Sequence, residues 1–106
     1  MKEITVEKLK QKIDNGEEFT FLDVRELFET YISSINIKTV SIPLEELNDR
    51  TDELAKNDEI IAMCRCGNRS KTACELLLQH GFTDVVNLKG GINAWAAKID
   101  KSLPQY

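Results

Sequence analysis

The sequence predicts an α/β sandwich with a mainly parallel central sheet flanked by helices on both faces. Segments rich in β-branched and aromatic residues alternate along the chain with segments of helical spacing, which is typical of parallel sheets connected by helices. Residues 59–64 are apolar almost throughout, as expected for a strand that is covered on both faces. Together these two observations favour a sheet buried between two helical layers.

Length and composition narrow the class of protein further. With 106 residues and 42% hydrophobic positions, residues 1–106 are expected to form one folded domain, and general disorder is excluded. A net charge of -4 makes nucleic-acid binding a poor hypothesis. No apolar run approaches the roughly 20 residues of a membrane span. Charged residues among the first seven positions occupy the place where a signal peptide has its apolar stretch. We therefore expect a cytoplasmic protein, whose odd number of cysteines, 3, argues against a disulfide framework.

The first half of the chain is expected to form a helix, two strands and a second helix. Thr5 precedes apolar residues at helical spacing, and Asn15-Gly16 ends that pattern, so a short capped helix lies between them. Residues 19–24 and 39–42 have the composition of strands. A polar helix is expected over residues 44–55.

The second half continues the alternation after the strand at residues 59–64. Residues 71–80 form the clearest helix of the sequence, with Gly81 at the position of a left-handed cap. Residues 84–88 are expected to form another strand. A last helix over residues 92–99 follows Gly90-Gly91, which permits a tight turn.

The segment that joins the strand at residues 59–64 to the next helix contains the reactive residue types. Open α/β sheets bind ligands at the carboxyl ends of their strands, and the unpaired N–H groups of a helix start favour an anion. Arg65 and Arg69 flank Cys64 in sequence. One guanidinium at about 6 Å, in an effective dielectric of about 20, lowers a thiol pKa by about two units. We expect Cys64 to be a thiolate nucleophile; the alternative is a structural cysteine near surface arginines.

Three motifs, in order along residues 4–98, resemble the rhodanese-like sulfurtransferases. Cys64-Arg65-Cys66-Gly67-Asn68-Arg69-Ser70 is similar to the active-site loop of that family, where a strand ends in Cys and a short loop reaches Arg before Ser opens a helix. Residues 21–26 resemble its Asp-Val-Arg-Glu segment, and residues 86–95 resemble its closing Leu-x-Gly-Gly-x-x-x-Trp segment.

The resemblance implies a sulfurtransferase in which Cys64 accepts a sulfane sulfur and becomes a persulfide. It further implies a small anionic donor such as thiosulfate, a thiol or cyanide acceptor or a persulfide-carrying protein, and no cofactor, metal, nucleic acid or membrane. Asp23 and Arg25 would form an internal polar pair that supports the site, and Arg69 would also brace the loop. The residues implied in substrate binding are Arg65, Cys66, Gly67, Asn68, Arg69 and Ser70.

The chain departs from the family pattern at three places. Thr30-Tyr31-Ile32 stands where many members have Gly-His-Ile, and the longer path to Ser41 is expected to affect the pocket wall. The single histidine, His80, lies at a helix end and is not placed beside Cys64. Formation of the thiolate must therefore rely on electrostatics rather than on a histidine base. Cys66 replaces a small hydroxyl residue: it is either a substitution of similar size or a second thiol that attacks a Cys64 persulfide and releases sulfide. Cys74 is expected in the core.

Three other functions are weaker on the sequence. A cysteine phosphatase or arsenate reductase of related architecture uses Cys-x5-Arg, whereas four residues separate Cys64 from Arg69. A zinc site built from the cysteines and His80 lacks the Cys-x2-Cys spacing of structural sites. A non-catalytic rhodanese-like binding module would be expected to have lost the cysteine or its arginine.

Overall fold

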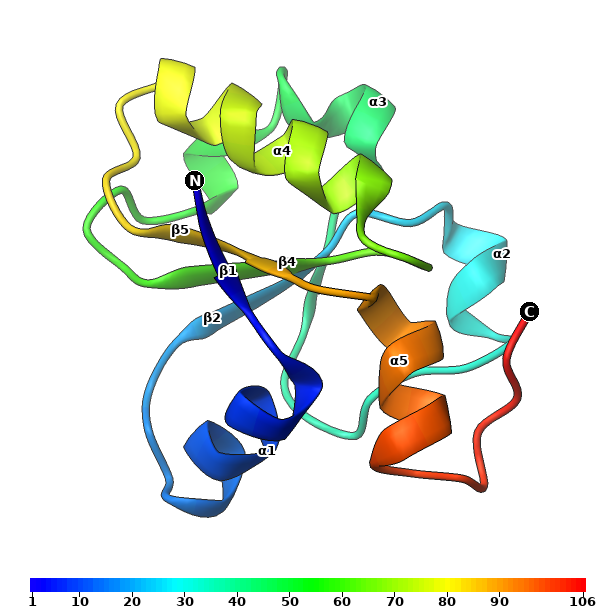
Figure 1. Cartoon of the computed structure of the whole chain (residues 1–106). Helices are drawn as coiled ribbons and strands as arrows, with labels where there is room; N and C mark the ends of the chain where they lie inside the picture. The colour runs from blue at the N-terminus through cyan, green and yellow to red at the C-terminus, as the bar shows by residue number, and fades with distance from the viewer.

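The computed structural model describes all 106 residues and contains a five-stranded sheet in the order β1-β5-β4-β2-β3 (Figure 1). Every neighbouring pair of strands is parallel, which confirms the predicted fold class. The strands are β1 (Lys2–Ile4), β2 (Thr20–Asp23), β3 (Val40–Ser41), β4 (Ile60–Met63) and β5 (Val85–Leu88).

Helices cover both faces of this sheet, α1 and α5 on one side and α3 and α4 on the other (Figure 1). The helices are α1 (Val6–Asp14), α2 (Leu27–Thr30), α3 (Leu44–Leu47), α4 (Asn68–Gln79) and α5 (Gly91–Lys98), with a 3-10 turn at Thr51–Glu53. As predicted, Thr5 caps α1, and its hydroxyl accepts the N–H of Lys8. No helix combines the length and the apolar content that a bilayer crossing requires.

Strand β4 shows why its sequence is apolar throughout. Successive side chains of a strand point to opposite faces of the sheet. Ile60 and Ala62 pack into the core beneath α3 and α4, whereas Ile61 and Met63 pack into the core beneath α1 and α5. Trp95 of α5 belongs to the second core, as predicted, and is 6% exposed. Each central strand therefore joins two hydrophobic cores.

The helix predicted over residues 44–55 is wrong in extent. The structure has one helical turn, α3, and then the separate 3-10 turn; Asn48 and Asp49, which follow α3, are residues of low helix propensity. Leu47 of α3 and Leu54, which directly follows the 3-10 turn, are nevertheless buried in the same core. Helix α4 begins at Asn68, three residues before the predicted residue 71.

Two short elements were not predicted. Strand β1 is an edge strand that pairs only with β5, and its mostly exposed residues show no apolar pattern. Helix α2 is a single turn within the stretch that follows β2. Its four residues are too few for a helical period to be visible in the sequence.

Gly90 and Gly91 turn β5 directly into α5 through left-handed backbone, with φ of +79° and +60°. The N–H of Ile92 donates to the Cys64 carbonyl at 2.9 Å, and the N–H of Asn93 donates to the Arg65 carbonyl at 3.1 Å. A Cβ on Gly91 would collide with both of these carbonyl oxygens. The start of α5 is therefore docked directly on the residues that follow β4.

This docking predicts that Gly91→Ala destabilises the protein far more than Gly16→Ala. Gly16 has a similar φ of +68° but no atom near the place of a Cβ, so its substitution adds backbone strain of about 1–2 kcal/mol. Gly91→Ala adds a collision with backbone, and we expect a further loss of about 2 kcal/mol or more in the free energy of unfolding. Urea denaturation measures both variants, and equal losses would contradict the docking.

Candidate active site

Cys64 lies immediately after β4 at the carboxyl edge of the sheet, with 1% of its surface exposed. Its Sγ accepts a hydrogen bond from the N–H of Gly67 at 3.1 Å, and the Ser70 Oγ lies 3.4 Å away. Gly67 has a φ of +106°, which lets the backbone curl back around the sulfur and open α4. The loop thus surrounds one sulfur atom with hydrogen-bond donors.

These donors, more than the neighbouring arginines, set the ionisation of the thiol. Burial opposes ionisation of Cys64, but the Ser70 hydroxyl and the backbone N–H groups of Ser70, Gly67 and Cys66 outweigh it and lower the pKa below that of an ordinary thiol. Arg65 and Arg69 were expected from the sequence to be the main cause of a lowered thiol pKa. In the structure the main cause is the set of hydrogen bonds to the sulfur, and the start of α4 contributes through them.

Arg69 forms an ion pair with Glu29 of α2. The two guanidinium nitrogens Nη1 and Nη2 donate to Oε2 and Oε1 of Glu29 at 2.7 and 2.8 Å. Arg69 holds the pKa of Glu29 down to about 2 against the opposing effect of burial, with further donors from the Glu26 N–H and the Tyr106 hydroxyl. Glu29 was not singled out from the sequence, yet its side chain ties the loop to α2.

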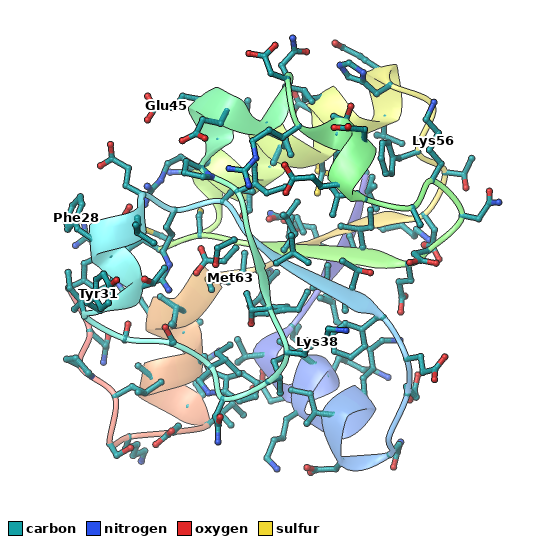
Figure 2. The ribbon with its side chains drawn as sticks, turned by 180° about the vertical axis from the view of Figure 1, so that it is seen from behind. Phe28, Tyr31, Lys38, Glu45, Lys56 and Met63 are labelled. Atoms are coloured by element: carbon teal, nitrogen blue, oxygen red, sulfur yellow. The ribbon has the colours of Figure 1, made fainter.

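Helix α2 otherwise faces solvent. Phe28 is 61% exposed and Tyr31, just after the helix, is 83% exposed, and both point away from the body of the protein (Figure 2). Glu29 alone among the residues of α2 is buried. Helix α2 is therefore connected to the site through Glu29.

Asp23 and Arg25 form a buried ion pair, with Arg25 Nη2 2.8 Å from Asp23 Oδ2. The remaining donors of Arg25 bind the Glu29 carbonyl at 3.2 Å, the Ser33 carbonyl at 2.9 Å and the Tyr106 hydroxyl at 2.9 Å. Arg25 therefore joins the end of β2 to α2 and to the segment after it, where the sequence indicated no regular element.

Asn87 is a site residue that the sequence argument missed. It is buried in β5, where its Nδ2 donates to the Gly67 carbonyl and to Glu3 Oε2, each at 3.2 Å. Its Oδ1 lies 2.5 Å from Ser70 Oγ. A lone amide within the apolar run Val-Val-Asn-Leu was the available signal, because buried polar side chains need partners.

Ser70 lies between Cys64 and Asn87 and has one hydroxyl proton for two acceptors. Beside a neutral thiol, the hydroxyl can donate to Asn87 Oδ1 and accept the S–H of Cys64. Beside a thiolate, its proton can turn to the sulfur. The same residue can thus serve both protonation states of Cys64.

The other cysteines differ sharply from Cys64. Cys66 is exposed on the loop, while Cys74 is buried within α4, and burial raises its pKa to about 12. His80 contacts the side chain of Asn48 at 2.9 Å and does not approach Cys64. No group of three or more His, Cys, Asp or Glu side chains is placed to hold a metal ion.

A cavity of about 430 Å³ lies beside the loop, and Arg69 forms one of its walls. The lining residues are Val24, Glu26, Pro43, Leu44, Glu45 and Arg69. Residues 31–41, which were expected to affect the pocket wall, contribute none of them and instead line part of a separate cavity that contains Asp23 and Met63. Figure 2 shows Glu45 pointing outward on α3.

Comparison with known proteins gives consistent results. A family model described as "Rhodanese-like domain" matches residues 5–98. The putative sulfur carrier protein YrkF of Bacillus subtilis is 40% identical over 98 residues, which cover 92% of this chain and 52% of that protein. The putative sulfurtransferase YtwF of the same organism is 37% identical over 95 residues, covering 90% of each chain. The chain thus spans about half the length of YrkF but nearly all of YtwF.

The fold comparison agrees with the sequence comparison. The crystal structure of a rhodanese-like domain protein from Staphylococcus aureus matches with a TM-score of 0.83 at 34% sequence identity. The match covers 90% of this chain and 91% of the other. The similarity therefore extends over the sheet and its flanking helices alike.

The Glu29–Arg69 pair predicts a specific acid sensitivity. A carboxylate whose pKa is lowered by folding stabilises the folded state above its ordinary pKa of about 4.3, and that stabilisation fades as the pH falls from there towards 2. We expect Glu29→Gln to remove this part of the pH dependence, on the order of 3 kcal/mol, and to lower stability at pH 7. Urea unfolding over a series of pH values measures it, and Glu18→Gln, an exposed control, should keep the wild-type slope.

The Ser70 hydroxyl predicts a shift in thiol reactivity. Ser70→Ala removes one donor from the Cys64 sulfur, so the pH midpoint of Cys64 alkylation by iodoacetamide should rise by about one unit. Thr72→Ala is the matched control, because its hydroxyl is exposed on the same helix and faces the Asn68 carbonyl. An unchanged midpoint in Ser70→Ala would show that the hydroxyl does not support the thiolate.

Proposed function

The chain belongs to the rhodanese-like domain family, and on that premise we propose that it is a sulfurtransferase that forms a persulfide on Cys64. One observation supports the proposal above the others: a buried Sγ at the sheet edge with the Gly67 N–H and the Ser70 hydroxyl directed at it. Relatives named as a sulfur carrier and a sulfurtransferase, at 40% and 37% identity, support the same class of reaction.

The first half-reaction loads the sulfur. The Cys64 thiolate attacks the outer sulfur of a donor such as thiosulfate, forming a new S–S bond to Sγ. The S–S bond of the donor breaks, and sulfite leaves with the electron pair. The exposed guanidinium of Arg65 is the group of the loop that can favour such an anion, because Arg69 is already paired with Glu29.

The second half-reaction unloads the sulfur. An acceptor thiolate or cyanide attacks the outer sulfur of the persulfide, and Cys64 leaves as a thiolate. The hydrogen bonds that lower the pKa of Cys64 also make it a better leaving group, so the same donors assist both half-reactions. Neither half-reaction requires a histidine base, and neither uses a metal or a cofactor.

We propose that the rest of the acceptor occupies the cavity beside Arg69. The hydrogen-bond donors of the loop converge on Sγ of Cys64, and Arg69 of the same loop lines the cavity. The acceptor can be a small thiol or a persulfide-carrying protein; the relative named a sulfur carrier favours the second. Exposed Cys66 would be either a substitution of similar size for a small hydroxyl residue or a second thiol that attacks the Cys64 persulfide, leaving a Cys64–Cys66 disulfide and releasing sulfide.

Mass spectrometry of the intact protein after incubation with thiosulfate tests the proposal. We expect the mass of one added sulfur atom on the peptide that contains Cys64, with release of one equivalent of sulfite. Addition of cyanide should remove the added sulfur as thiocyanate. Cys64→Ala should show no adduct while its circular dichroism spectrum stays native.

If neither thiosulfate nor a low-molecular-weight persulfide adds sulfur to the wild-type protein, the sulfurtransferase proposal fails.

The Cys66→Ser variant distinguishes the two roles proposed for Cys66. A longer-lived adduct in that variant, with less sulfide released, supports an attack by Cys66 on the persulfide. Behaviour like that of the wild type rules this attack out.

A further inference from the structure

The chain after α5 returns to the loop that follows β4. The end of the chain lies beside α2 in Figure 1. Its residue Tyr106 is eight positions beyond the family match, which ends at residue 98. Asn93 of α5 holds the main chain of Tyr106 from both sides: its Oδ1 accepts the N–H of Tyr106 at 3.1 Å, and its Nδ2 donates to the main-chain oxygen of Tyr106 at 3.2 Å. The main chain of Tyr106 is therefore held at the start of α5.

The Tyr106 side chain meets three charged residues of the site. Its hydroxyl donates to Glu29 Oε1 and accepts from Arg25 Nη1, each at 2.9 Å. The guanidinium carbon of Arg65 lies over its ring, 5.1 Å from the centroid. One side chain thus contacts the ion-pair network at its hydroxyl and an exposed arginine on its ring face.

The contact between Arg65 and the Tyr106 ring matters because the other arginines of the site are paired with carboxylates. Arg25 is paired with Asp23, and Arg69 is paired with Glu29. Arg65 forms no salt bridge. An aromatic face attracts a guanidinium without supplying a compensating negative charge, unlike a carboxylate. The ring can therefore hold Arg65 in one place and leave its positive charge available.

We propose that Tyr106 is a positioning residue that holds Arg65, the residue that follows Cys64 in the chain, as a positive charge without a carboxylate partner, and so favours anionic reagents at the Cys64 sulfur. The proposal deepens the proposed function, because an anionic sulfur donor would be one such reagent. It does not depend on that function for its test, because the selectivity of Cys64 towards anions can be measured with alkylating reagents.

The experiment compares two reagents that perform the same substitution at sulfur. Iodoacetate is an anion and iodoacetamide is neutral, and peptide mass spectrometry reads the modification at Cys64 alone. We expect Tyr106→Leu to lower the ratio of the iodoacetate rate to the iodoacetamide rate by about two- to fivefold. The rates are compared at a pH above the midpoint of Cys64 alkylation, where the thiolate predominates in both proteins, and the iodoacetamide rate itself should then stay near the wild-type value because Tyr106 donates nothing to the Cys64 sulfur. Tyr106→Phe keeps the ring and should retain most of the ratio.

Coupling between Arg65 and Tyr106 is the sharper test. Arg65→Gln should also lower the ratio, and adding Tyr106→Leu to it should lower it no further. Asn93→Ala, which releases the main chain of Tyr106, should act in the same direction. Tyr31→Leu is the matched control, because Tyr31 is 83% exposed, and its ratio should equal that of the wild type.

Two results would overturn the proposal: an unchanged ratio in Tyr106→Leu, or a further drop in the Arg65→Gln background. An unchanged ratio in which both reagents react more slowly would indicate general loosening, which thermal unfolding checks independently. Uptake of sulfur from thiosulfate is scored separately. If the ratio behaves as expected and no sulfur is taken up, the positioning role stands and the sulfurtransferase proposal fails.

Discussion

The structure around the site depends on one constraint: a sulfur atom that is to carry charge is almost fully buried at the edge of the sheet. Burial alone would keep Cys64 neutral, so donors must converge on it, and the Gly67 N–H and the Ser70 hydroxyl do so. Those donors must themselves be held, which is the work of Asn87, bonded to Ser70 and to the Gly67 carbonyl. The left-handed turn at Gly67 is the backbone solution that makes this convergence possible.

A second set of polar contacts lies outside this first one and organises the arginines. Arg25 and Arg69 are each matched by a carboxylate, and Tyr106 touches both pairs through a single hydroxyl. Arg69 still interacts electrostatically with Cys64 although it is paired with Glu29. Arg65 is the arginine of the loop that has no carboxylate partner and lies over the Tyr106 ring instead.

The sequence was sufficient for the fold class, for most elements and for the loop around Cys64, because each has a local signature: apolar runs, a capping threonine, and Cys followed by Gly and Arg before a helix. It was insufficient where the structure depends on distant pairing. Asn87 gave a readable signal, a polar residue in an apolar strand, but its partners Ser70 and Glu3 come from other elements. Glu29 and Tyr106 gave no signal in the sequence, because hydrogen bonds between residues 40 or 77 positions apart leave no period or motif.

The contact between α5 and the chain after β4 has a consequence for how the loop acts. Its peptide groups are used on both sides: the carbonyls of Cys64 and Arg65 accept N–H groups of α5, while the Gly67 N–H faces the sulfur. Their dipoles are thus oriented when the protein folds, before any charge moves, and little reorganisation remains to be done as sulfur is exchanged. Reactivity at Cys64 is then a property of the packed strand-and-helix framework, sensitive to changes in the docking of α5 as much as to changes in the loop.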